Sequence, residues 1–129
     1  MSMTDRIARL RGLLSEKIVD AVLITKEENL QYFSGFRGDS TALLVTCDRL
    51  VLITDSRYTE QAAAQAPDYE IIEQKDGLYQ KIAEAAESCG VVALGFEGGA
   101  LAYDNYEKLK ALLGEISFDT SLTLDMLRQ

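Results

Sequence analysis

The sequence predicts an α/β domain with three layers, in which helices cover both faces of a mixed, five- to six-stranded sheet that contains one antiparallel hairpin. The first observation is that short apolar runs alternate with segments in which apolar residues recur at helical spacing. The second is that the apolar runs 41–46 and 50–54 are separated only by Cys47-Asp48-Arg49. A crossover connection cannot fit there, so these two strands must be antiparallel neighbours. The 129 residues form one domain, residues 1–129.

A first helix is expected to begin at Thr4, whose hydroxyl can cap it, with Asp5 facing the positive end of the helix dipole. Four apolar residues fall on one face of this helix: Ile7, Leu10, Leu14 and Ile18. A buried strand over 21–24 follows it.

A short helix is expected next, because Thr25-Lys26-Glu27-Glu28 has the spacing of a capping box and Gly35 can end the helix. After the hairpin, Asp55 is placed to cap a helix over 56–66, which ends before Pro67.

The second half alternates strands and helices. A strand is expected over 69–73, followed by a helix that Asp76 caps and Cys89-Gly90 ends, with Leu78, Ile82 and Ala85 on its inward face. A strand over 91–96 and a helix over 103–113 come next, and this helix has Tyr106, Leu109 and Leu113 on one face. A strand over 115–118 and the start of a helix in 122–129 complete the chain.

Composition narrows the function classes. The net charge is −8 and the basic residues are scattered, which argues against binding to nucleic acid. No apolar run reaches the roughly 20 residues that span a bilayer, and the N-terminus has no apolar signal-peptide core. We therefore expect a cytoplasmic protein without a membrane partner, with Cys47 and Cys89 as small buried thiols rather than a disulfide.

Few residues offer catalytic chemistry. The chain has no histidine, which removes the commonest general base and metal ligand, and its two cysteines form no CxxC pair. We expect no catalytic residue and no metal site in this chain. The stretch Gly95-Phe96-Glu97-Gly98-Gly99 follows a strand but lacks the full frame of a phosphate-binding loop, so a glycine turn leading to a helix explains it better.

Asp55 raises an alternative function. It follows an apolar strand near the middle of the chain, where a response-regulator receiver domain carries its phospho-acceptor aspartate. Two features oppose this interpretation: Thr25-Lys26 intervenes where a receiver has a paired acid, and the hairpin breaks the all-parallel sheet of receivers. The structural interpretation is that Asp55 caps a helix and pairs with Arg57 or Tyr58.

The stretch Arg37-Gly38-Asp39-Ser40 is the tetrapeptide of some cell-adhesion ligands. A three-letter match arises by chance in on the order of 1% of chains of this length, and an adhesion ligand would need an export signal. The role of residues 37–40 therefore depends on the residues that surround them.

Several segments together resemble the N-terminal domain of the creatinase/prolidase ("pita-bread") metallopeptidases, such as Xaa-Pro dipeptidase and aminopeptidase P. The matching pieces, which cover essentially the whole chain in order, are Asn29 with Tyr32, Gly35-Phe36, Leu43-Leu44-Val45-Thr46, Ile53-Thr54-Asp55-Ser56-Arg57-Tyr58 with Glu60-Gln61-Ala62, Leu94-Gly95-Phe96-Glu97, and the helix with Tyr106 and Leu109. The stretch 37–40 departs from the small Gly/Ser-rich segment that many relatives carry.

The resemblance implies a non-catalytic domain of a proline-specific metallopeptidase. Two divalent metals, such as manganese or cobalt, would be held by Asp, His and Glu ligands of a catalytic domain expected after Gln129 and absent from this chain. The expected partners are that catalytic domain, a second copy in a homodimer, and a proline-containing peptide substrate. The loop that would cap the partner's substrate channel contains Phe36 as an apolar wall, Arg37 as a carboxylate-binding group, Asp39 and Ser40. The alternative is that this loop is only a solvated turn.

Overall fold

The structure, a computed structural model, describes residues 2–128. Its elements in chain order are α1 (Met3–Lys17), β1 (Ala21–Ile24), α2 (Glu27–Ser34), β2 (Ala42–Thr46), β3 (Leu50–Thr54), α3 (Thr59–Gln65), β4 (Glu70–Glu73), α4 (Leu78–Ser88), β5 (Ala93–Phe96), the 3-10 turn η1 (Gly98–Ala100), α5 (Tyr103–Leu113), β6 (Ser117–Asp119) and the 3-10 turn η2 (Asp125–Arg128).

One six-stranded sheet runs through the molecule in the order β4-β3-β2-β1-β5-β6. The predicted hairpin is confirmed, since β2 and β3 are antiparallel. β1 and β2 form a second antiparallel pair, which the sequence analysis did not specify, while β3–β4, β1–β5 and β5–β6 are parallel. The sheet is therefore mixed, as predicted.

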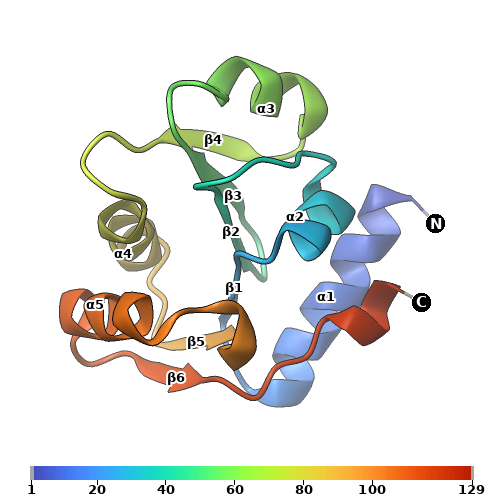
Figure 1. The fold of residues 1–129 in the computed structure, drawn as a ribbon. Helices are drawn as coiled ribbons and strands as arrows, with labels where there is room; N and C mark the ends of the chain where they lie inside the picture. The colour runs from blue at the N-terminus through green and yellow to red at the C-terminus, as the bar shows by residue number, and fades with distance from the viewer. Residues whose placement is uncertain (1, 129) are drawn as a thin grey trace.

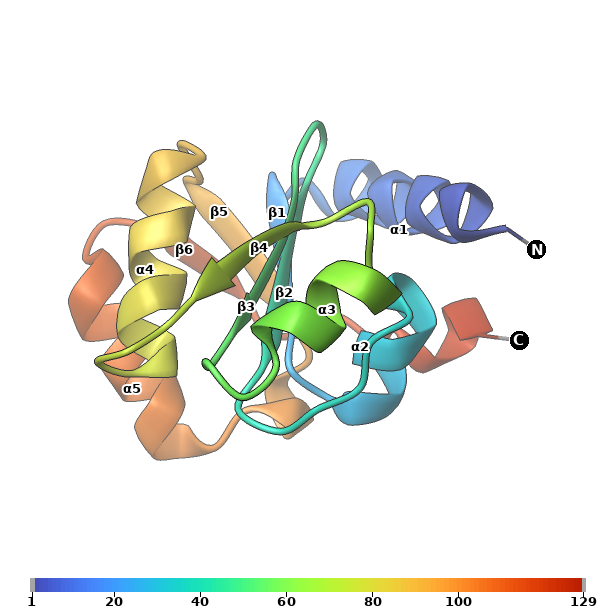
Figure 2. The same cartoon turned by 90° about the horizontal axis from the view of Figure 1, so that it is seen from above.

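Helices cover both faces of this sheet (Figures 1 and 2). One face is covered by α1, α2 and α3, and the other by α4 and α5. The period of two in the strands divides the core: Val22 and Ile24 of β1 face the α1 side, whereas Ala21 and Leu23 face the α4 side. Each fully buried aliphatic side chain contributes about 1.5–3 kcal/mol, so two apolar layers supply most of the stability. The three-layer prediction is confirmed.

The predicted helix starts need correction. Ser2, not Thr4, caps α1: its hydroxyl accepts a hydrogen bond from the Asp5 backbone N–H (3.1 Å), and the Asp5 carboxylate accepts one from the Ser2 N–H (3.4 Å). Thr25 does not cap α2, because its hydroxyl donates to the carbonyl of Ala100 instead, and Lys26 takes the N-cap position without a side-chain bond. The tertiary hydrogen bond from Thr25 to Ala100 thus replaces the capping hydrogen bond that the local sequence predicts.

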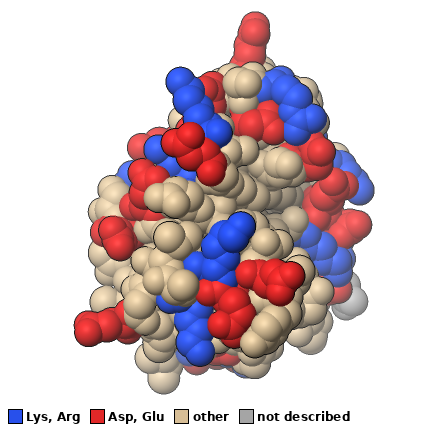
Figure 3. Space-filling model, turned by 60° about the vertical axis from the view of Figure 1, so that its left-hand side comes forward, with Lys and Arg blue, Asp and Glu red and all other residues tan. Residues whose placement is uncertain are grey.

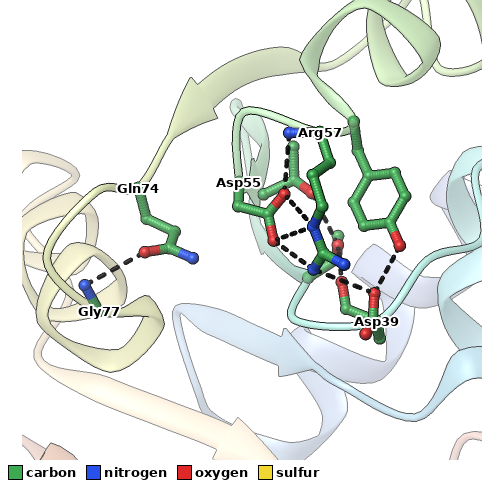
Figure 4. Close-up of polar contacts among 8 residues, drawn as sticks. Asp39, Asp55, Arg57, Gln74 and Gly77 are labelled. Atoms are coloured by element: carbon green, nitrogen blue, oxygen red, sulfur yellow. Dashed lines mark hydrogen bonds and ion pairs between the residues drawn. The ribbon is translucent and has the colours of Figure 1, made fainter.

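Two acidic residues also do not cap helices. The Asp55 carboxylate stabilises a turn, and α3 begins only at Thr59, with Tyr58 at the N-cap. Gly77 precedes α4 with φ 135°, and the side chain of Gln74, rather than that of Asp76, accepts the hydrogen bond from its N–H (3.1 Å; Figure 4).

Other differences lie at element ends. Ile18, expected on the buried face of the first helix, is the C-cap of α1 and is 86% exposed. Cys47, expected to be buried, is exposed at the hairpin, Cys89 is half-buried, and both are free thiols. The C-terminal segment forms the 3-10 turn η2 within its described residues instead of a longer helix.

The surface mixes charges of both signs. On the face shown in Figure 3, Lys and Arg side chains are interspersed with Asp and Glu side chains instead of forming a basic patch. Among residues 2–128, the structure contains no helix with the length and apolar character needed to cross a bilayer.

Candidate functional site

The candidate site is the loop 35–41, which joins α2 to β2 and lies beside the carboxyl end of β3. Gly35 begins it in the left-handed conformation, with φ 90°, and ends α2. A β-carbon on Gly35 would lie 2.7 Å from the carbonyl oxygen of Gln65, so glycine is required both by conformation and by space. The entry of the loop is therefore tightly specified.

Phe36 anchors the loop in the core. It is fully buried, and its ring packs edge-on against Tyr58, with 5.7 Å between ring centroids. Gly38 lies directly over this ring, because a β-carbon there would be 2.7 Å from Phe36 Cζ. Packing under the loop takes up the whole side chain, so Phe36 offers no exposed surface for the apolar wall that the resemblance implies.

Arg37 points back along α2. Its Nε atom donates to Glu27 Oε2 (3.3 Å), and its Nη1 atom donates to Gln31 Oε1 (3.3 Å). Its Nη2 atom also lies 4.0 Å from Glu28 Oε1. About half of the Arg37 side chain remains exposed, so these are surface pairs in which the guanidinium is partly neutralised.

A second cation, Arg57, organises the other end of the loop (Figure 4). Its guanidinium lies between the carboxylates of Asp55 and Asp39, with Nη2 2.6 Å from Asp55 Oδ2 and 3.4 Å from Asp39 Oδ1. Tyr58 Oη donates to the same Asp39 oxygen (2.7 Å). Loop residue Asp39 is therefore held by two side chains that follow β3.

The protonation equilibria reflect these contacts. The hydrogen bond from the Arg57 side chain lowers the pKa of Asp55, and the same contact raises the pKa of Arg57. The hydrogen bond from Tyr58 to Asp39 raises the pKa of the Tyr58 phenol. At neutral pH these contacts favour a charged Asp55–Arg57 pair beside a neutral Tyr58 phenol.

A buried hydroxyl pair supports the end of the loop. The Oγ1 atoms of Thr41 and Thr54 lie 2.8 Å apart, and Thr41 Oγ1 is also 2.8 Å from the carbonyl oxygen of Asp39. Ser40 is exposed and adopts a positive φ of 49°. The sequence analysis missed both threonines, although two threonines at facing strand ends are a recognisable signal of a cross-strand hydroxyl pair.

The predicted site residues fall into two groups. The structure brings together Asp39, Asp55, Arg57 and Tyr58, whereas Arg37, which follows α2, pairs with the acidic first turn of that helix. This arrangement presents fixed polar groups at a surface. Within residues 2–128, the structure contains no group of three or more His, Cys, Asp or Glu side chains that could hold a metal ion.

Fold and loop together define a three-layer α/β domain with a mixed sheet and a rigidly anchored polar surface loop. Residues 6–129 match the family model of the Creatinase/Prolidase N-terminal domain. The chain belongs to this family. The receiver interpretation of Asp55 is accordingly replaced, in agreement with the two antiparallel strand pairs and with the engagement of the Asp55 carboxylate by Arg57.

Relatives of known sequence or structure agree with this assignment. The chain is 36% identical over 110 residues to the "uncharacterized peptidase YqhT" of Bacillus subtilis, a match that covers 85% of this chain and 31% of that protein. It is similar to an Xaa-Pro dipeptidase from Bacillus anthracis, with 33% identity and a TM-score of 0.91 over 98% of this chain and 36% of the other. It is also similar to the N-terminal domain of the cytoplasmic peptidase PepQ from Mycobacterium tuberculosis, with 36% identity and a TM-score of 0.85 over 96% of this chain and 98% of the other. The chain thus spans about a third of the length of the first two of these proteins.

Proposed function

We propose that this chain is the non-catalytic N-terminal domain of a cytoplasmic, proline-specific metallopeptidase of the Xaa-Pro dipeptidase or aminopeptidase P type. The observation that carries the proposal is that nearly the whole chain, which matches the Creatinase/Prolidase N-terminal domain, is similar to about a third of an Xaa-Pro dipeptidase. Catalysis and its divalent metals then belong to a catalytic domain of the same polypeptide, outside this chain. The absence of histidine from this sequence is consistent with that division.

Within such an enzyme, the domain is proposed to mediate homodimer formation and to cap the partner subunit's active site with the loop 35–41. Support comes from the rigidity of the loop: Phe36 and Gly38 fix its packing, while Tyr58 and Arg57 fix Asp39. A preformed loop loses little entropy on meeting a substrate, so it can orient a short peptide efficiently. Of the four loop residues that the resemblance implied for this contact, Arg37, Asp39 and Ser40 are exposed, and Phe36 is buried.

The test compares this chain with the full-length protein that contains it. With manganese, cobalt or zinc added, the full-length protein should hydrolyse peptides with proline in the second position, and this chain alone should not. Light scattering of the full-length protein should give the mass of a dimer. Activity of this chain alone, or inactivity of the full-length protein on every Xaa-Pro peptide, would contradict the proposal.

A further inference from the structure

The glycine-rich stretch 95–99 has a function in the structure that its sequence did not reveal. Gly95 lies against Leu122, because a β-carbon at Gly95 would be 2.4 Å from the Leu122 side chain. Gly98 donates a backbone hydrogen bond to the carbonyl of Thr120 (3.0 Å), and Glu97 forms an isolated antiparallel bridge with Ser121. The stretch therefore contacts the C-terminal segment 120–128 at successive positions.

The Glu97 side chain continues this contact. Its Oε2 atom accepts a hydrogen bond from the Leu124 backbone N–H (3.1 Å), and its Oε1 atom accepts one from the Asn29 side-chain amide (2.6 Å). Asn29 is fully buried, so its bond to the carboxylate is shielded from water and strengthened. A single carboxylate thus joins α2, the end of β5 and the C-terminal segment.

Asp125 closes the network from the other side. Both oxygens of its carboxylate lie 3.1 Å from Lys26 Nζ, and Oδ1 also accepts from Arg128 (3.0 Å) and, at 3.5 Å, from the Asn29 amide. The hydrogen bond and charge of Lys26 lower the pKa of Asp125. The ion pair therefore persists over the neutral pH range.

Apolar packing lies beneath these polar contacts. Leu122 and Leu124 are buried in the same core layer as α1 and α2, and η2 packs against both helices. In Figure 1 this red segment runs along the α1 and α2 side of the molecule. A terminal segment of a domain is ordinarily poorly ordered unless specific contacts hold it.

We propose that Asn29, Glu97 and Asp125 form a clamp that fixes the direction in which the polypeptide leaves this domain, and that this clamp sets the position of the downstream catalytic domain relative to this domain. The proposal rests on the proposed function for the identity of the downstream domain. These three are positioning residues: they act through the segment 120–128 and contact no substrate. A capping domain needs a rigid connection to the catalytic domain, because misplacement of a positioning group by about 1 Å can lower the rate of catalysis by about a hundredfold.

The first experiment measures amide hydrogen exchange by mass spectrometry in this chain. Three variants weaken the clamp in different ways. Asn29→Ala removes the buried bridge, and Gly95→Ala displaces Leu122. Asp125→Ala breaks the half-exposed ion pairs and the 3.5 Å contact with the Asn29 amide, and it carries little risk to folding. Exchange in 121–128 should become about tenfold faster or more, as expected for loss of a net hydrogen-bond contribution, while β2 and β3 change less.

The matched control is Thr54→Val, which removes the buried Thr41–Thr54 hydroxyl pair and contacts no part of the clamp. It should lower protection in β2 and β3 without a selective effect on 121–128. If the clamp variants raise exchange in 121–128 no more than Thr54→Val does, the clamp does not exist and the proposal is overturned.

The second experiment uses the full-length protein and small-angle X-ray scattering. Asp125→Ala and Asn29→Ala should increase the radius of gyration and broaden the distribution of interdomain distances, whereas Thr54→Val should not. If the enzyme hydrolyses Xaa-Pro peptides, the clamp variants should also lower kcat/KM without changing metal content. An unchanged scattering profile would overturn the positioning role even with an active enzyme, while an inactive wild type with a changed profile would overturn only the proposed function.

Discussion

Asp55 shows how a residue can be recognised correctly as structural while its contacts are predicted only in part. Pairing with Arg57 or Tyr58 was predicted, and the pair with Arg57 is present, with Nη2 and Oδ2 2.6 Å apart. The predicted cap is not formed, because the Asp55 carboxylate accepts the Arg57 N–H within a turn, and α3 begins only at Thr59, four residues after Asp55. The sequence could not reveal that Arg57 also reaches Asp39, which lies 18 residues earlier in the chain.

The pairing of Asp55 makes stability depend on pH. Arg57 lowers the pKa of Asp55 in the folded state, so the charged pair stabilises the protein above the unfolded pKa, about 3.9, and this contribution is lost as the pH falls through the folded pKa. Asp55→Asn keeps the shape but removes the charge. It should lower Tm at pH 7, and the difference from wild type should shrink as the pH falls below the unfolded pKa and vanish once the pH lies below the lowered folded pKa. In an Arg57→Gln background, Asp55→Asn should no longer show this pH dependence; a difference that is constant with pH would assign the effect to the turn alone.

Gly38 and Gly12 form a matched pair for testing how the loop is packed. A β-carbon at Gly38 would lie 2.7 and 2.9 Å from two atoms of the buried Phe36 ring, whereas one at Gly12 would meet nothing within 4 Å. Gly38→Ala should therefore lower the free energy of unfolding by about 1–3 kcal/mol through overpacking. Gly12→Ala, in the exposed middle of α1, should raise it by about 0.5–1 kcal/mol. Urea unfolding of both variants gives the comparison; equal signs would mean that the Phe36 ring yields easily.

At the scale of the elements, hydrophobic periodicity predicted the bounds of elements that apolar packing determines. It did not predict the helix starts that side-chain hydrogen bonds determine. The strand 21–24 and the helix 103–113 have the predicted bounds because apolar spacing alone defines which residues are buried. The predicted start of α2 was wrong because the Thr25 hydroxyl bonds to the carbonyl of Ala100, 75 residues away, instead of forming the local cap. Sequence patterns contain the candidate caps, and the tertiary structure selects among them.

The end of α1 offers a test of backbone strain. Ile18 has φ 57° and ψ 46°, in the left-handed region that costs a β-branched residue roughly 1–2 kcal/mol, and it is 86% exposed, so little burial compensates. Ile18→Gly should raise the free energy of unfolding by about 0.5–1 kcal/mol after the greater entropy of glycine in the unfolded chain is counted. The corresponding rise in Tm is roughly 2–5 °C.

Val92→Gly is the control for Ile18→Gly. Val92 is also β-branched and 68% exposed, but its φ is not positive. Glycine there relieves no strain and should leave Tm unchanged or lower it. A fall in Tm for Ile18→Gly would show that the Ile18 side chain makes a stabilising contact that outweighs its conformation.

At the scale of the whole molecule, the sequence predicted the layers but not the strand order. The three-residue connection proved the β2–β3 pairing, because short connections restrict topology. Nothing local indicated that β1 lies between β2 and β5, or that Glu97 meets Asn29 across 68 residues. Such contacts depend on which elements are neighbours in space, and a single sequence contains that information only through the complete packing of the chain. The same limit applies to Phe36, because the sequence did not indicate that its ring packs under Gly38 and against Tyr58.

The proposed capping role of the loop 35–41 can be tested in the full-length protein. If Arg37 reaches a substrate carboxylate, Arg37→Ala should raise KM for short Xaa-Pro peptides, since a charge-assisted hydrogen bond contributes about 1.5–3 kcal/mol, or roughly ten- to hundredfold in kcat/KM. Glu27 and Glu28 compete for the guanidinium, so we expect the lower end of this range, about tenfold. Asp39→Ala should lower KM if Asp39 repels the same carboxylate.

Arg49→Ala is the control for Arg37→Ala. Arg49 forms an equivalent surface pair with Glu70 (2.6 Å) at the opposite end of the β2–β3 hairpin, so its loss should leave the kinetics unchanged. Both arginine variants of this chain should melt close to wild type, because surface changes usually alter stability by about 0.5 kcal/mol or less. Equal kinetics for Arg37→Ala and Arg49→Ala would reduce the loop to a structural turn.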